Sequence, residues 1–231
     1  MTSHLETALT SVDWNANVAD FVTDVASMED IEKVNLRTAI WARQLEKADA
    51  GNPALSFVRE MQAAGIQAAI LIGLAMYKSS ASSMRAMLEA GLYYTYFRTH
   101  PEELATLVSD ARYFIGKGEI IDYHKVHSAG FRSKQEKLGL VTKLDSWYSD
   151  ISAVVHGQIP GKWSTTKSVT RDADLIAESV AKFIAGEDAL HRLLLCTAGT
   201  ALWDSFSPPA KAKLLKGLPG DQKVALDLDA A

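Results

Sequence analysis

Helical periodicity runs through almost the whole chain and constrains its fold more than any other feature. Apolar residues recur at spacings of three and four, strict apolar–polar alternation is hard to find, and no Asn-Gly or Asp-Gly hairpin signal occurs. The strongest apolar run, residues 66–76, is far shorter than the roughly 20 residues that cross a bilayer. The sequence therefore predicts an all-α multi-helix bundle with a long central apolar helix and extra terminal helices, and no membrane partner.

Glycine, proline and polar clusters divide the chain into three expected parts. Residues 1–50 are expected as an N-terminal helical extension packed on the core, 51–206 as the bundle itself, and 207–231 as a short helix followed by a loose tail from Gly217. The helices are expected at 7–26 (one or two helices), 30–50, 54–77, 84–99, 102–110, 140–156 and 172–203, with 79–83 as a loop or N-cap and 111–139 as short irregular pieces.

Composition excludes several classes of protein. The chain has 231 residues, 48% of them hydrophobic, and a single cysteine, Cys196. One cysteine rules out an internal disulfide framework and a cysteine-based zinc finger, and it fits a reducing compartment. The first 20 residues carry no Lys or Arg, so they lack the basic region of a secretory signal. A cytoplasmic protein is expected.

Charge is distributed unevenly along the chain. The formal net charge is −4, yet residues 111–171 hold ten basic and five acidic side chains between two acidic flanks. Such a basic segment fits an anionic ligand such as RNA, and equally a solvated surface whose lysines neutralise the acidic ends. The candidate nucleic-acid-binding residues are Lys134, Lys137, Lys143, Lys162 and Lys167.

The expected helix at 140–156 carries the first candidate for chemistry. Its apolar face is expected to hold Val141, Leu144, Tyr148, Ile151 and Val155, while Ser152 and His156 stand one turn apart on its flank. A histidine there can act as a general acid or base near neutral pH. The alternative is structural, because a histidine in the last turn interacts with the helix dipole and a serine can bond to a carbonyl one turn earlier.

A second candidate lies in the segment 83–98. Arg85 and Glu89 form an i,i+4 pair, with Tyr93 and Tyr96 expected on the same side of the helix. An exposed pair would contribute only a few tenths of a kcal/mol to the helix. A half-buried Arg85 would instead be a fixed guanidinium able to hold a phosphate.

These two segments together resemble the HEPN-like helical superfamily. The likeness rests on Arg85-x-x-x-Glu89 followed by aromatic residues, and on the later run 147–157 with its Ser152-x-x-x-His156-Gly157 pattern. It covers residues 54–200. Within the superfamily, the chain most resembles uncharacterised bacterial members that have an Arg/Glu helix and a later Ser-x-x-x-His-Gly helix. The resemblance implies a helical bundle, a homodimer, and metal-independent ribonuclease activity in toxin–antitoxin or phage-defence systems.

The resemblance also implies site residues. In active members an Arg and a His near one helix end, with four to six residues between them, act on RNA, and His156 matches that His. The residues at those spacings are Ile151, Asp150 and Ser149, so the family's Arg is absent there. We therefore propose Arg85 as the cation and expect the catalytic set Arg85, Glu89, Ser152 and His156.

Two functions follow from the sequence. The first is a HEPN-like protein that binds or cleaves RNA, with no cofactor and no metal site. The second is a non-catalytic helical interaction module, such as an antitoxin or a defence-complex subunit, that binds a protein partner. The missing Arg favours the second function, and the basic segment favours the first.

Overall fold

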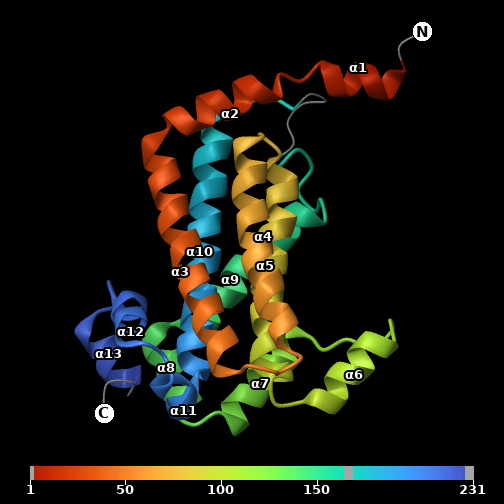
Figure 1. The fold of residues 1–231 in the computed structure, drawn as a ribbon. Coiled ribbons are helices and arrows are strands. Elements are labelled where there is room, and N and C mark those ends of the chain that lie inside the picture. Colours follow the sequence, from red (N-terminus) through yellow and green to blue (C-terminus); the bar gives the residue numbers. More distant parts are fainter. Residues whose placement is uncertain (1–2, 164–168, 227–231) are drawn as a thin grey trace.

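The computed structural model describes residues 3–163 and 169–226, and these residues form helices joined by turns, with no strand among them. The predicted all-α bundle is confirmed (Figure 1). Among the described residues, no helix is both long enough and apolar enough to cross a membrane. The helices are α1 (His4–Thr10), α2 (Trp14–Thr23), α3 (Val25–Ala48), α4 (Leu55–Gly73), α5 (Tyr77–Phe97), α6 (Pro101–Ser109), α7 (Lys117–His127), α8 (Phe131–Leu138), α9 (Leu140–Val155), α10 (Ala173–Thr197), α11 (Gly199–Asp204), α12 (Pro208–Leu215) and α13 (Gly220–Leu226).

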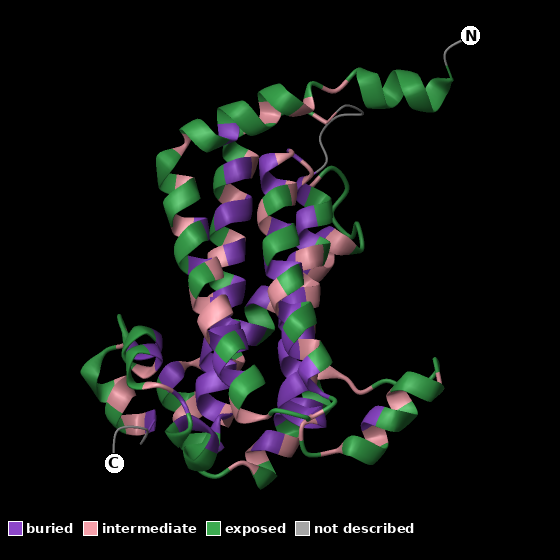
Figure 2. Ribbon diagram, viewed as in Figure 1, coloured by how far each residue is buried: buried purple, intermediate pink, exposed green. Residues whose placement is uncertain are grey.

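Five long helices make the body of the bundle. The α4 and α5 helices pack along each other, and α10 packs against α3, α5 and α9. Their facing sides are buried along most of their length (Figure 2). Because α3 contributes Trp41 and Leu45 to the same core, the expected boundary at residue 50 falls in the turn between two packed helices.

The α5 helix begins earlier than the sequence predicts. Residues 79–83, expected as a loop or N-cap, lie inside its first turns. Ser80 is fully buried and its hydroxyl donates to the carbonyl of Ala68 at 2.9 Å. That bond satisfies the serine within the bundle, and the run of small residues lets α5 lie close to α4. Serine and alanine here serve helix packing rather than a turn.

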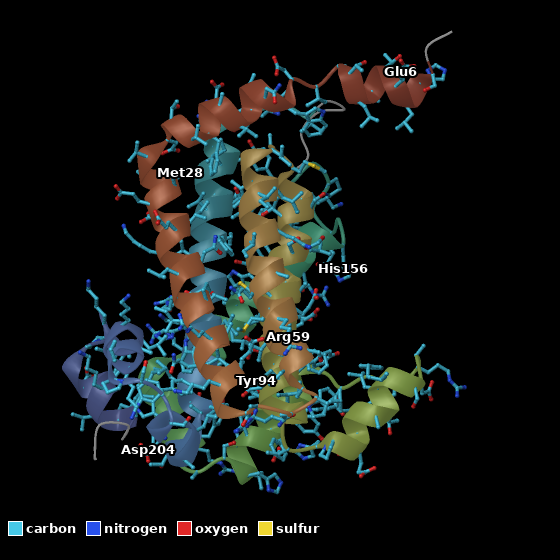
Figure 3. The ribbon with its side chains drawn as sticks, in the orientation of Figure 1. Glu6, Met28, Arg59, Tyr94, His156 and Asp204 are labelled. Carbon is cyan, nitrogen blue, oxygen red and sulfur yellow. The ribbon has the colours of Figure 1, made fainter. Side chains whose placement is uncertain are left out.

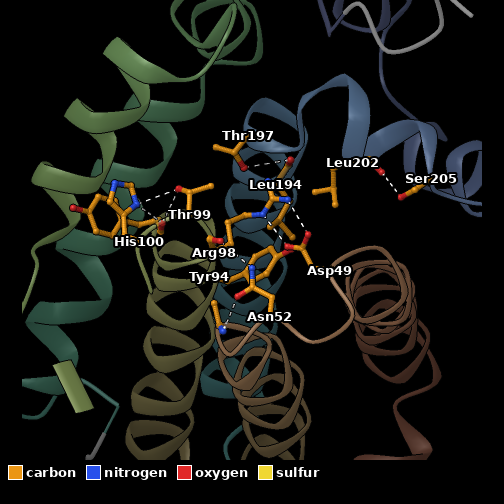
Figure 4. Close-up of polar contacts among 12 residues, drawn as sticks. Asp49, Asn52, Tyr94, Arg98, Thr99, His100, Leu194, Thr197, Leu202 and Ser205 are labelled. Carbon is orange, nitrogen blue, oxygen red and sulfur yellow. Dashed lines mark hydrogen bonds and ion pairs between the residues drawn. The ribbon is translucent and has the colours of Figure 1, made fainter. Parts of the chain in front are cut away.

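A polar network fixes the far end of α5 to the α3–α4 turn (Figure 4). The Arg98 guanidinium donates to both carboxylate oxygens of Asp49 at 2.9 and 3.0 Å, and the Tyr94 hydroxyl donates to Asp49 at 2.7 Å. The Asn52 amide donates to the carbonyl of Arg98 at 2.9 Å. These bonds hold the position of α5, the helix that carries Arg85.

The C-terminal segment is more ordered than expected. Residues 220–226 form α13 instead of a loose tail, and Leu226 is fully buried. This helix packs against α8, while α12 packs against α3. Leu226 is the one buried residue of α13, so this short segment shows too little periodicity to predict a helix from sequence.

Two glycines allow close approach to α10. A Cβ on Gly91 of α5 would lie 2.2 Å from Leu190 Cδ1, so only glycine leaves room for that leucine. A Cβ on Gly186 of α10 would lie 2.4 Å from the Trp147 ring. Trp147 is held by a bond from its indole nitrogen to the carbonyl of Lys182 at 2.7 Å. Gly186 therefore provides space for Trp147.

The substitution Gly186→Ala tests this packing. Alanine favours a helix over glycine by about 1 kcal/mol, whereas overpacking against a fixed ring costs about 1–3 kcal/mol, so we expect a net loss of up to about 2 kcal/mol. Gly118→Ala is the matched control, because a Cβ on that α7 glycine meets no atom within 4 Å. Urea unfolding should show Gly186→Ala less stable and Gly118→Ala no less stable than wild type. A more stable Gly186→Ala would refute the close contact.

Candidate functional site

The α9 helix ends where the sequence predicts, at a left-handed glycine. It spans Leu140–Val155, with His156 as its C-cap and Gly157 at φ +65°. The buried face differs from the expected one: Leu140, Leu144, Trp147, Ile151 and Val154 face the core, and Tyr148 is only half-buried. Trp147 occupies the space beside Gly186, and this turns Tyr148 toward the flank that carries His156.

Arg85 and His156 are in direct contact, although 71 residues separate them in the sequence. The Arg85 Nη1 atom lies 2.6 Å from His156 Nε2. A guanidinium can only donate, so Nε2 is the acceptor in this contact. His156 is exposed on the outer side of the bundle (Figure 3). An accessible imidazole and a fixed cation therefore share one point on the surface.

Glu89 and Tyr148 hold the guanidinium in place. Arg85 donates from Nε to Glu89 at 2.9 Å and from Nη2 to the Tyr148 hydroxyl at 2.9 Å, while that hydroxyl donates to Glu89 at 2.5 Å. The guanidinium carbon also lies 5.0 Å from the centroid of the Tyr148 ring, a cation–π distance. Glu89, Tyr148 and His156 thus fix the plane of the Arg85 guanidinium. The Arg85 side chain is 23% exposed.

The surroundings of Tyr148 and Arg85 raise the pKa values of both side chains. Burial raises the pKa of Tyr148 to about 12, with a further contribution from the hydrogen bond to Glu89, so the phenol stays a donor at neutral pH. Burial alone would lower the pKa of Arg85, but the bond and charge of Glu89 outweigh it and raise that pKa. Arg85 is therefore a permanent cation.

Two lysines border the cluster. Lys117 Nζ lies 5.2 Å from the centroid of the Tyr148 ring and forms an ion pair with Asp145. Lys78 Nζ lies 3.5 Å from the position that a Cβ would take on Gly157, next to His156. The surroundings of the imidazole thus carry positive charge besides Arg85.

Other residues of the expected site lie apart from these contacts. The Ser152 hydroxyl is buried and has no hydrogen-bond partner among the described residues. Tyr96 is buried and donates to Glu103 at 2.6 Å, and Tyr93 packs edge-on against Phe57 and Phe97. Of the expected catalytic set, the structure brings Arg85, Glu89 and His156 into one bonded cluster and leaves Ser152 unbonded beside it.

Two of the candidate nucleic-acid-binding lysines lie far from the cluster, and two others are paired with carboxylates. Lys134 and Lys137 lie on α8, at the opposite end of α9 from His156, which is about 24 Å along a 16-residue helix. Lys143 pairs with Asp188 at 3.3 Å and Lys162 with Glu178 at 3.7 Å. Lys167 lies outside the described residues.

Sequence reasoning missed Tyr148, Lys117 and Lys78 as neighbours of His156. Tyr148 stands four residues before Ser152 and eight before His156, so the helical spacing already placed it on their stripe. Its aromatic character favoured a core position instead. Lys78 and Lys117 had no such signal, because only the packing of α5, α7 and α9 brings them to the cluster.

Comparison with protein-family models, curated proteins and solved structures finds no match to this chain. The resemblance to HEPN-like proteins therefore remains a prediction from the motifs of α5 and α9.

Proposed function

We propose that this protein binds RNA at the Arg85–His156 cluster and cleaves its phosphodiester bonds. The observation that carries the proposal is the 2.6 Å contact between the guanidinium of Arg85 and the exposed imidazole of His156. A guanidinium is the side chain best suited to a phosphate, and a neutral imidazole can take up a proton at physiological pH. The two groups that transesterification of RNA requires are thus adjacent.

The contact also suggests how substrate would activate the histidine. In the free protein the Nε2 lone pair accepts from Arg85. When a phosphate oxygen replaces Nε2 as the acceptor of this hydrogen bond from Arg85, the Nε2 lone pair becomes free. Nε2 then accepts the proton of the neighbouring 2′-hydroxyl, the 2′-oxygen bonds to phosphorus, and the bond from phosphorus to the 5′-oxygen breaks. The imidazolium returns its proton to that 5′-oxygen, which leaves a 2′,3′-cyclic phosphate and a 5′-hydroxyl end.

The roles of the other cluster residues follow from their bonds. Glu89 and Tyr148 orient Arg85, so less motion is lost when a phosphate binds. Lys78, near Gly157, and Lys117, near the Tyr148 ring, are further cations that would hold flanking phosphates. Binding is expected to weaken with salt because contacts to phosphates release counterions, and the pairing of Arg85 with Glu89 and of Lys117 with Asp145 should keep that dependence moderate.

Cleavage of tRNA and total RNA by the purified chain tests the proposal. Wild type should yield ends with 2′,3′-cyclic phosphate, and an oligonucleotide with 2′-deoxyribose throughout should stay intact because it lacks the nucleophile. His156→Gln should lower the rate by at least about 100-fold, the usual contribution of a general base.

His100→Gln is the matched control, because His100 stacks on Tyr96 outside the cluster and should cleave like wild type. The proposal fails if wild type leaves RNA intact, or if His156→Gln and His100→Gln cleave equally. Folding of each variant is checked by circular dichroism.

A toxin or phage-defence role belongs to the same proposal, since RNA cleavage would arrest growth. Expression of wild type, but not His156→Gln, is then expected to slow a bacterial culture.

One observation favours the second function, an antitoxin or defence-complex subunit. Leu36, Ile66 and Ile70 are about half exposed, and Leu36 and Ile66 line a hollow of about 290 Å³ between α3 and α4. A stable protein complex lost in Ile66→Glu but kept in His156→Gln would support it.

A further inference from the structure

The N-terminal helix α1 buries none of its residues against the part of the chain that the structure describes. None of the residues of α1 is buried, and Leu5 and Leu9, one turn apart, are 69% and 54% exposed. Figure 1 shows α1 projecting beyond the bundle, and Figure 2 shows it exposed along its length. A helix of seven residues is not stable alone in water. An apolar stripe on such a helix points to a contact with another molecule.

Charge narrows the identity of that molecule. Residues 3–23, which contain α1 and α2, carry Glu6, Asp13 and Asp20, and no Lys or Arg. We call α1 and α2 together the acidic arm. Anionic lipids and nucleic acids would repel it. The surface it fits must therefore combine apolar contact with positive charge.

The turn between α7 and α8 offers such a surface. It is hollowed by about 460 Å³, and its lining includes Lys125, Arg132, Ala129 and Val126, the last of which is 68% exposed. Lys125 pairs with Asp122, whereas Arg132 has no acidic partner within the ranges that the structure describes. The Arg132 Nε donates to the carbonyl of Lys125 at 2.9 Å, which holds the guanidinium at the rim.

The hollow between α3 and α4 is a poorer match. Glu32 lines it, and none of its lining residues is basic. An acidic arm would be repelled there, so charge selects the α7–α8 surface over the α3–α4 hollow.

The arm cannot reach the α7–α8 surface of its own chain. The two lie at opposite ends of the bundle (Figure 1). The length of the bundle is about that of α3, whose 24 residues extend about 36 Å. Two copies that lie side by side in opposite directions would place each arm at the other's α7–α8 turn. Such a reciprocal contact closes on itself as a two-fold dimer.

We propose that the acidic arm of one copy docks on the α7–α8 surface of a second copy, with Leu5 and Leu9 against Val126 and with Arg132 facing the arm's carboxylates. The contact involves neither Arg85 nor His156, and it holds whether or not the protein cleaves RNA. Its result is a reciprocal homodimer.

Sedimentation equilibrium of the full chain at low salt tests the proposal. Wild type should be a dimer, and high salt should weaken it because opposite charges meet at the contact. Leu5→Ser and Leu9→Ser should each raise the dissociation constant by about tenfold or more. Neither leucine is buried in the protomer, so both variants should keep the wild-type unfolding midpoint when monomeric.

Leu36→Ser is the matched control, an exposed leucine of the α3–α4 face whose loss should leave the dimer intact. Arg132→Glu should weaken the dimer, and adding Glu6→Lys should restore part of it. The proposal is overturned by a monomer at every concentration, by an assembly larger than two, or by a dimer that only Leu36→Ser dissolves.

Discussion

Replacing Arg37 with methionine is expected to lower the free energy of unfolding by about 3–5 kcal/mol at pH 7, the usual cost of leaving a buried charge unpaired. Arg37 Nε donates to both oxygens of Glu187 at 2.9 and 2.8 Å, and Glu187 is 1% exposed between α3 and α10. Burial raises the pKa of Glu187, opposed by these bonds. Without Arg37 the carboxylate must be buried as an anion or take up a proton.

Urea unfolding of Arg37→Met, Glu187→Gln and the double variant measures this effect. Glu187→Gln in the Arg37→Met background should recover part of the loss, because an amide does not carry the buried charge. The loss in Arg37→Met should also shrink as the pH falls and Glu187 protonates. A cost below about 1 kcal/mol would show that Glu187 is solvated instead of buried.

Mild acid is expected to destabilise the protein through two buried histidines. Burial lowers the pKa of His124 to about 4 and that of His191 to about 3. In the unfolded chain both return to about 6.5, so the unfolded state binds more protons between pH 6.5 and the folded pKa values. Stability is therefore lost as the pH falls through that window. Between pH 7 and pH 5 the loss is about 2 kcal/mol for each histidine.

Both imidazoles are integrated into the core. His191 Nδ1 accepts from the Trp41 indole at 2.9 Å, and His124 contacts Thr95 and Ser128 at 3.0 and 2.7 Å. Glutamine at either position removes the titration while it retains hydrogen-bonding groups. The raised pKa of Glu187 acts in the opposite direction, and comparison of each variant with wild type cancels it.

Urea unfolding at pH 7 and pH 5 provides the measurement. Wild type should lose more stability than His191→Gln or His124→Gln over this interval, by about 2 kcal/mol in each comparison. An equal loss in wild type and both variants would show that neither histidine is buried in its neutral form.

The sequence predicts much of the fold because helix periodicity and caps are local signals. The Asp172 cap at the start of α10 and the Gly157 end of α9 are both where the sequence places them. The early start of α5 and the order of α13 depend on single buried contacts, those of Ser80 and Leu226, that no local pattern reveals.

The candidate site could be predicted only in part. The pair Arg85–Glu89 follows from helical spacing, but the contact of Arg85 with His156 depends on how α5 and α9 pack beside α10. Gly91 and Gly186 set these distances, because each admits a side chain from the facing helix. The rotation of α9 that exposes Tyr148 also follows from the space that Gly186 leaves for Trp147. These are properties of packing between helices.

The most direct test of the central claim is a double-mutant cycle on RNA cleavage with Arg85→Lys, His156→Gln and both together. If the contacting pair acts as one catalytic unit, each single variant loses at least about 100-fold in rate and the double variant loses little more than the worse single one. Losses that multiply would contradict a shared step, and single variants as active as wild type would contradict the site itself.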